Sequence, residues 1–297
     1  MCREMNRTQW AFAAGAMGIL AAVLVLCSIG PKEPAYHGRS LSSWLEEWGE
    51  SYNDRTNPAT IAIRAIGSNG VPILLARLAK EQSPDERKFW AVVGKVLPES
   101  WNPLDRDISR AVTAAEAINL LGMEAKSAFP TLTNLMTIKA HRITAAIGLA
   151  GMGHEGVAVL LQALTNQDFM LRFSAANALQ EAGSDFDKVV PALLEVVKIG
   201  GSKKENFLLR GAAASALIRL HKEPDLVVPV FSEFLTSPDA GERSWGATLL
   251  KGLGPDAKAA VPLLLKLRTD EDRDVRAAAE AALKEIAPAT SAKAGLK

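Results

Sequence analysis

Apolar residues between positions 58 and 287 recur with the period of a helix, in pairs of short segments. The first segment of each pair has an arginine, two small residues, a leucine seven places after the arginine and often a glycine at eleven, as in RFSAANALQEAG and RSWGATLLKGLG. The leucine-type positions are Ile118, Leu149, Leu179, Leu217, Leu250 and Leu283, at steps of 30 to 38 residues. This pattern predicts a repeated helix that glycine ends.

A second apolar segment follows each of these helices. It contains Pro130, Pro191, Pro229 or Pro262, eight residues after the glycine position. Proline suits the first turn of a helix, where its missing N–H would have no partner anyway. One helix pair cannot bury its apolar face alone, so neighbouring pairs should stack. Because no long strand-like alternation competes, the predicted fold class is all-α, an α-solenoid of helix–turn–helix repeats.

Polar residues in the repeat indicate how the helices begin. Asp107, Asp168, Asn206, Asp239 and Asp272 lie four places before the arginine position and are predicted to be N-caps. The units resemble HEAT repeats, especially the short bacterial kind found in membrane-anchored or exported proteins, over roughly residues 58–287. The resemblance implies a ladder between these acidic residues and Arg142, Arg172, Arg210, Arg243 and Arg276, rather than an anion-binding row.

The N-terminus carries a hydrophobic segment. The 24 residues between Arg7 and Lys32 have no charge, and as a helix they would span about 36 Å, enough to cross a bilayer. With Arg3 and Arg7 before it, residues 10–29 are predicted to cross a bacterial inner membrane once, with the N-terminus cytoplasmic and the repeats periplasmic. A lipoprotein lipidated at Cys27 and a cleaved, secreted chain are alternatives, although Leu26 departs from the small residue that usually precedes a lipidated cysteine.

The remaining organisation follows from composition. Residues 1–30 form the anchor or signal, 31–57 a linker and tryptophan-containing capping helix, 58–287 the array with an irregular insertion at 81–109, and 288–297 a tail. Leu41, Trp44, Leu45 and Trp48 form one apolar stripe behind Ser40, a predicted N-cap. A cap over the open end of the array is favoured over a ligand platform.

Catalytic, cofactor and metal sites are not predicted. The net charge is +1, which argues against nucleic-acid binding. Both cysteines lie in the N-terminal segment and the four histidines match no metal-ligand motif; His154 and His221 are expected at helix C-termini. The Gly-rich stretches GSNG and GMGHEG join two helices, whereas a phosphate loop follows a strand.

The predicted function is a non-enzymatic scaffold that binds an unidentified protein or peptide. The resemblance implies that the second helices line the concave face. Four places after the proline position, a column that should face water contains Asn134, Gln162, Glu195, Glu233 and Lys266. This column is the predicted partner surface, with simple solvation as the alternative and the insertion as a second candidate. A HEAT-like enzyme of the chromophore lyase or nucleic-acid glycosylase kind, or a purely structural envelope protein, remains as an alternative function.

Overall fold

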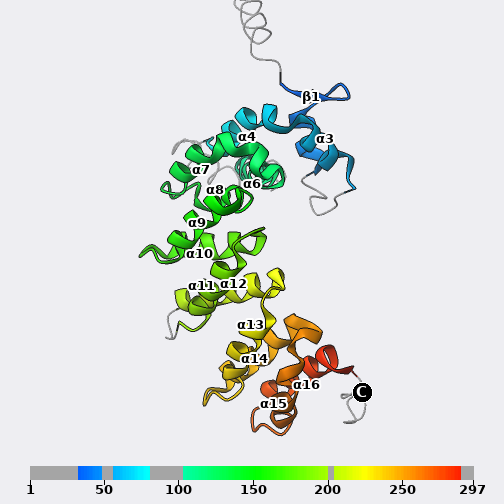
Figure 1. Cartoon of the computed structure of the whole chain (residues 1–297), viewed down its shortest axis with the longest axis vertical. Coiled ribbons are helices and arrows are strands. Elements are labelled where there is room, and N and C mark those ends of the chain that lie inside the picture. The colour runs from blue at the N-terminus through cyan, green and yellow to red at the C-terminus, as the bar shows by residue number, and fades with distance from the viewer. Residues whose placement is uncertain (1–32, 49–55, 81–102, 200–203, 289–297) are drawn as a thin grey trace, which may run out of the picture. The chain divides into compact units, whose positions relative to one another are not determined.

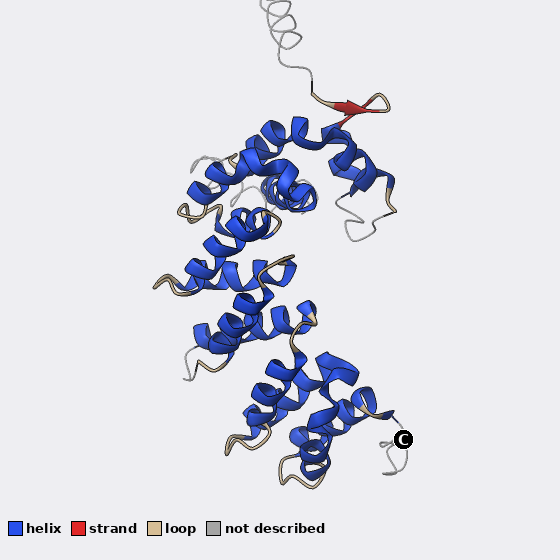
Figure 2. Cartoon of the chain, in the orientation of Figure 1, coloured by secondary structure: helices blue, strands red, loops and turns tan. Residues whose placement is uncertain are grey.

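A computed structural model describes residues 33–48, 56–80, 103–199 and 204–288. The predicted membrane segment with Cys27, most of the insertion and the C-terminal tail lie outside these ranges. The chain divides into two compact units, residues 1–70 and 71–297. Helices dominate both, as Figure 2 shows.

The first unit begins with a small hairpin of strands β1 (Ala35–Tyr36) and β2 (Arg39–Ser40), in which Ala35 lies opposite Ser40. Helices α2 (Leu41–Trp48) and α3 (Pro58–Ile66) and the 3₁₀ helix η1 (Gly67–Gly70) follow. The Ser40 hydroxyl accepts the Ser43 N–H at 3.3 Å, as predicted for an N-cap.

The apolar stripe of α2 is buried within this unit. All four of its members, Leu41, Trp44, Leu45 and Trp48, are at least nine-tenths buried. The indole N–H of Trp48 donates to the Thr60 hydroxyl on α3 at 2.9 Å, so the polar end of the buried ring has a partner. The stripe therefore packs as core and does not present a ligand platform.

The second unit is a stack of helix pairs (Figure 1). Its first helices are α6 (Pro103–Leu121), α8 (Arg142–Ala150), α10 (Phe169–Ala178), α12 (Lys204–Leu220), α14 (Ala240–Leu253) and α16 (Arg273–Ile286). Its second helices are α4 (Val71–Leu78), α7 (Phe129–Leu135), α9 (Gly153–Leu164), α11 (Phe186–Val197), α13 (Pro224–Phe234) and α15 (Val261–Leu267). The 3₁₀ helices η3 (Gly122–Ala128), η4 (Leu179–Glu181) and η5 (Gly254–Ala260) join some of them.

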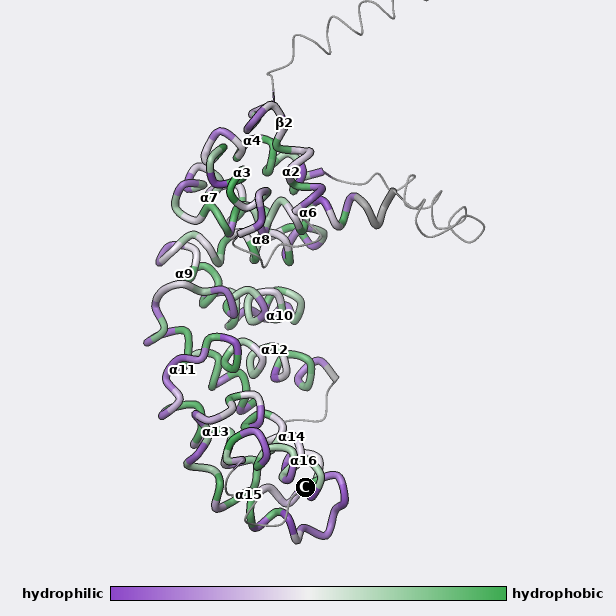
Figure 3. The backbone as a smooth tube through the Cα atoms, turned by 90° about the vertical axis from the view of Figure 1, so that its right-hand side faces the viewer, coloured by the Kyte–Doolittle hydropathy of each residue, from purple (hydrophilic) through white to green (hydrophobic). Residues whose placement is uncertain are grey.

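The core of this unit runs between the two rows of helices. From α8 onward, Figure 3 shows the first helices along one side of the stack and the second helices along the other. Each of the six predicted leucine-type anchors, from Ile118 to Leu283, is at most 1% exposed. Successive first helices pack on one another, as do α9, α11 and α13. The predicted solenoid of stacked helical pairs is confirmed for the described residues.

The prolines occupy two different settings. Pro130 and Pro262 lie in the first turn of α7 and α15, as predicted. Pro191 and Pro229 were expected there too, but they lie inside α11 and α13. Those helices begin earlier because Asp185 and Glu223, with φ of 55° and 51°, turn the chain directly into a helix. The other two prolines follow the 3₁₀ turns η3 and η5, which separate them from the helix before.

Three of the five predicted N-caps are confirmed. The carboxylates of Asp168, Asp239 and Asp272 accept backbone N–H groups of α10, α14 and α16. Asp107 and Asn206 lie instead inside α6 and α12. Helix α6 begins earlier than predicted because proline, here Pro103, favours the first helical position. Helix α12 begins earlier because Lys204 and Glu205 are good helix formers.

One histidine prediction is confirmed and one is wrong. His221 directly follows α12 with φ of 45°, a positive value like those of Gly122 and Gly254, 55° and 58°, after their helices. His154 lies in the first turn of α9 rather than at a C-terminus, because the glycines of GMGHEG end α8 early and the next helix starts at Gly153.

One described stretch, Pro58–Leu78, is long and apolar enough to cross a membrane by length and composition alone. It is made of α3, η1 and α4. Gly67, with φ of 57°, ends α3 within it, and half of its most apolar window is buried. The stretch therefore has the character of core helices.

Candidate interaction surface

The predicted polar column faces solvent along the second helices. Its members lie within the last turn of five successive helices, α7, α9, α11, α13 and α15, and all are exposed: Asn134, Gln162, Glu195, Glu233 and Lys266. The neighbouring leucines Leu160, Leu193 and Leu264 are buried. We call these five exposed residues the second-helix ridge.

A row of threonines, which the sequence analysis did not identify, supports this ridge. Their hydroxyls donate to the carbonyl oxygens of Asn134, Gln162, Glu233 and Lys266 at 2.7 to 3.1 Å; the donors are Thr137, Thr165, Thr236 and Thr269. The same carbonyls accept the backbone N–H groups of these threonines, so each hydroxyl adds a further bond at the end of its helix. The signal in the sequence was a threonine three places after each of these ridge residues.

The remaining member of the ridge differs. Lys198 replaces the threonine after Glu195, and its Nζ lies 3.4 Å from a carboxylate oxygen of Glu195. The side chains of Asn134, Gln162, Glu233 and Lys266 form no hydrogen bond or ion pair with other described residues. Four of the five ridge side chains are thus free to contact another molecule.

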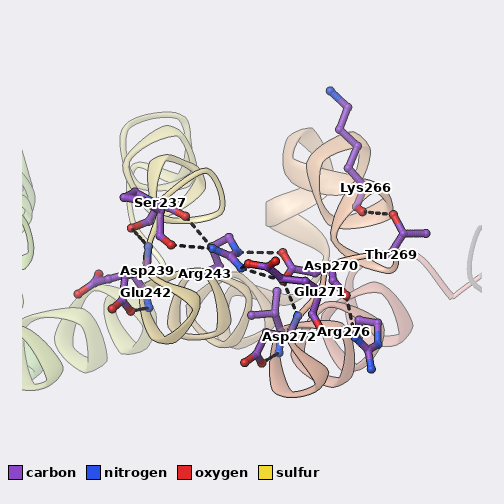
Figure 4. Close-up of polar contacts among 12 residues, drawn as sticks. Ser237, Asp239, Glu242, Arg243, Lys266, Thr269, Asp270, Glu271, Asp272 and Arg276 are labelled. Carbon is purple, nitrogen blue, oxygen red and sulfur yellow. Dashed lines mark hydrogen bonds and ion pairs between the residues drawn. The ribbon is translucent and has the colours of Figure 1, made fainter.

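The repeated arginines are used within the fold. Three of them reach the next repeat: Arg142 pairs with Asp168 at 2.8 Å, Arg210 with Glu242 at 2.7 Å, and Arg243 with Asp270 at 2.8 Å. The hydrogen bond from Arg142 lowers the pKa of Asp168, and the one from Arg243 lowers the pKa of Asp270. Of these pairs, only that of Arg142 with Asp168 joins members of the predicted ladder. Arg210 and Arg243 pair instead with Glu242 and Asp270, which the sequence analysis did not identify; Figure 4 shows the contacts of Arg243.

The arginines also hold the turns between repeats. Arg243 donates to the carbonyls of Ser237 and Pro238, at 3.0 and 3.1 Å, in the turn that precedes its own helix. Arg172 and Arg276 make the same pair of bonds in their own turns, at 2.7 to 2.9 Å. The turn contacts leave no row of free guanidinium groups for an anion. Arg172 and Arg276 depart from the predicted ladder, since each bonds carbonyls and no acidic side chain of the described residues.

Arg210 is the most buried arginine of the series, with 7% of its surface exposed. Both terminal nitrogens donate to the Glu242 carboxylate at 2.7 Å, and Nε donates to the Val197 carbonyl at 2.9 Å. Its guanidinium carbon lies 4.4 Å from the centre of the Trp245 ring and 5.3 Å from that of Phe234. The Arg210 side chain thus connects α11, α12 and α13 to α14 of the next repeat.

Metal-ligating side chains do not cluster in the described ranges. The His154 ring and the Asp185 carboxylate are in hydrogen-bond contact, but no third ligand joins them among the described residues. Burial opposes ionisation of Asp185, but hydrogen bonds from His154, Ser184 and Lys188 outweigh it and lower its pKa. The pair joins α9 to the start of α11 and has the character of a contact between repeats.

The sequence profile of HEAT repeats matches residues 137–201 and 199–284. No curated protein sequence matches the chain. Solved structures with a similar arrangement include an engineered protein, with 20% identity, a TM-score of 0.38 and coverage of 83% of this chain and 68% of that one.

Two structures of the karyopherin Kap121p are also similar, one bound to Nup53p and one bound to the extreme C-terminus of the protein phosphatase Cdc14p. Each has a TM-score of 0.46, with 14% and 13% identity, and this chain spans 29% of the karyopherin's length. The alignments cover 82% of this chain. The sequence profile shows that the chain contains HEAT repeats, and the described part has a HEAT-repeat solenoid-like fold.

Proposed function

We propose that the protein is a non-enzymatic scaffold that binds a partner protein or peptide along its second-helix ridge. The observation that carries the proposal is the repetition of exposed, largely unpaired polar side chains at the same place in five successive repeats. A row of evenly stacked hydrogen-bonding groups can follow an extended segment of another chain, and repeat arrays offer such continuous surfaces.

The ridge has a mixed character that suits a peptide more than a nucleic acid. Two amides are followed by two carboxylates and by a single lysine at its end, Lys266. Amide side chains can bond both N–H and C=O groups of a partner backbone, whereas Glu195 and Glu233 would repel phosphates. We expect the partner to place a basic or N–H-rich stretch over α11 and α13.

The test reverses the two ridge carboxylates in the double variant Glu195→Lys with Glu233→Lys. The matched control is Asp187→Lys with Asp225→Lys, which changes the same charge on the same two helices, but in the first turn of each. Proteins cross-linked to the full-length chain in cells are identified for the wild type and for both variants, after circular dichroism has shown that all are folded.

The ridge variant is expected to lose a cross-linked protein that the wild type and the control retain. Retention by the folded ridge variant would contradict the proposed surface. An untagged strain gives the background of the cross-linking experiment. If the wild type captures only proteins that are also found in this background, the scaffold proposal itself fails.

We propose further that residues 10–29 anchor the chain in a bacterial inner membrane with the repeats in the periplasm. The uncharged segment behind Arg3 and Arg7 supports this topology. An alkaline phosphatase fused to the C-terminus is then expected to be active, and a cytoplasmic reporter there would be inactive. The variant Cys27→Ser separates the alternatives, because only a lipoprotein would change its processing.

A further inference from the structure

A hollow of about 370 Å³ opens on the first-helix side of the array. It lies over helices α12, α14 and α16, and its walls include Phe207, Trp245 and Asp274. The ridge of the second helices contributes no residue to it. Its size is at the small end of the range for ligand sites, about 300–1,000 Å³, so it suits one or two side chains better than a cofactor.

The repeat register explains why the hollow exists. The two positions that lie three and two places before the repeated arginine are Phe207 and Leu208 in α12, but Ala240 and Gly241 in α14. Phe207 is 64% exposed. The repeat of α14 therefore lacks the large side chains that α12 presents at these positions, and a gap remains beside Phe207.

Exposed apolar side chains occupy the corresponding positions in two other first helices, whereas the repeat of α8 has Lys139 and Ala140 there. Ile108 on α6, Met170 on α10 and Leu208 on α12 are all exposed at the same two register positions. Exposed apolar side chains that line up across repeats indicate an interaction surface more strongly than single ones do. The hollow thus lies beside exposed apolar side chains of α12, at register positions that are also apolar and exposed in α6 and α10.

The floor of the hollow is held in place from within the fold. Trp245 lines it, with its ring 4.4 Å from the Arg210 guanidinium and 5.0 Å from the centre of the Phe234 ring. Arg210 is itself fixed by the Glu242 carboxylate. A ring that is already fixed loses little conformational freedom when a partner binds.

The charge of the hollow is negative. Among the residues that the structure describes, Asp272 and Asp274 line it and no basic residue does. Asp272 caps α16 by accepting the N–H groups of Asp274 and Val275. The carboxylate of Asp274 is exposed and forms no ion pair with another described residue.

We propose that this hollow binds a segment of a partner protein in which an aliphatic or aromatic side chain stands beside a lysine or arginine. The apolar side chain contacts Phe207 and Trp245 in the gap over Ala240 and Gly241. The neighbouring basic group pairs with Asp274. The site lies on the first helices, so it is distinct from the ridge proposed above.

The probe is a phage-displayed library of random dodecapeptides, selected against the full-length protein in detergent. Enriched peptides are expected to share an apolar residue next to lysine or arginine. One such peptide, labelled with fluorescein, is then titrated with each variant by fluorescence anisotropy. Asp274→Lys reverses the charge beside the hollow. Ser244 lines the hollow, so the larger side chain of Ser244→Leu fills it, and leucine is a good helix former.

Each of these variants is expected to raise the Kd of the peptide by about tenfold or more, because each removes one half of the recognition. The charge control is Asp187→Lys, which changes the same residue at the same second position of helix α11 and should leave the Kd unchanged. The ridge variant Glu195→Lys with Glu233→Lys should also bind normally.

Three outcomes would overturn the proposal: a selection that enriches no such motif, a Kd that neither Asp274→Lys nor Ser244→Leu changes, or a peptide whose binding only the ridge variant abolishes. The last outcome would support the function proposed for the ridge while rejecting this site. Circular dichroism of each variant shows that lost binding does not come from unfolding.

Discussion

Replacing Arg210 by methionine should destabilise the array far more than the same change at another arginine of the same helix. Arg210 joins α12 to the next repeat through Glu242 and is 7% exposed. Methionine keeps a similar stem but removes the ion pair, the bond to the Val197 carbonyl and the stacking on Trp245. The change isolates what the guanidinium contributes.

The magnitude follows from the burial of the two partners. Removing one member of a buried ion pair typically costs about 3–5 kcal/mol. The Glu242 side chain keeps 31% of its surface exposed, so water can partly solvate the carboxylate left behind. We therefore expect Arg210→Met to lower the free energy of unfolding by about 2–4 kcal/mol.

The matched control is Arg219→Met on the same helix. Arg219 pairs with Glu181 at 2.8 Å, but the two side chains are 49% and 41% exposed. An exposed pair of this kind contributes about 0–1 kcal/mol. High salt should further reduce the effect of Arg219→Met and leave most of the effect of Arg210→Met, because a buried pair is screened less.

Urea unfolding of the full-length chain, followed by circular dichroism, measures both variants. The slope of the transition must be compared as well as its midpoint, because weakening one interface of a repeat array can split the transition. Arg210→Met combined with Glu242→Leu should recover part of the loss, since no charge then remains buried. Equal costs at Arg210 and Arg219 would refute the reasoning.

Further predictions concern the core, the backbone and pH. Leu250→Ala should cost about 2–5 kcal/mol, as a buried anchor, whereas Leu226→Ala, at a site 48% exposed, should cost less than about 1 kcal/mol in the same urea assay. Gly211→Ala should stabilise the chain by about 0.4–1 kcal/mol, because its new methyl group meets open space within α12. Gly156→Ala should destabilise it, because the methyl group would meet a backbone carbonyl of α8. The lowered pKa of Asp270 gives a stabilisation that is complete above the unfolded value of about 3.9 and is lost as the pH falls through the folded value. Asp270→Asn should therefore flatten the decline of the urea midpoint below about pH 4.

Local signals in the sequence were sufficient for the repeats and their core. The arginine–leucine–glycine frame placed the anchors at Leu179, Leu217 and Leu250, and all are buried. Counting from the proline position likewise placed the ridge residues, such as Gln162 and Glu233, on the solvent-exposed side of the second helices. Both results depend on helical periodicity, which is a property of neighbouring residues and can be read from one sequence.

The partners of the polar side chains depended on the tertiary structure. Nothing local distinguishes Arg172, which bonds carbonyls of its own turn, from Arg210, which is buried against Glu242 of the next repeat. Likewise, the hollow beside Phe207 arises because two repeats place unequal side chains next to each other. The sequence by itself determined which face of each helix is apolar, because that follows from spacing along the chain. The packing of one repeat on the next decided which charges are paired and where a gap remains, because those contacts join residues about 30 positions apart.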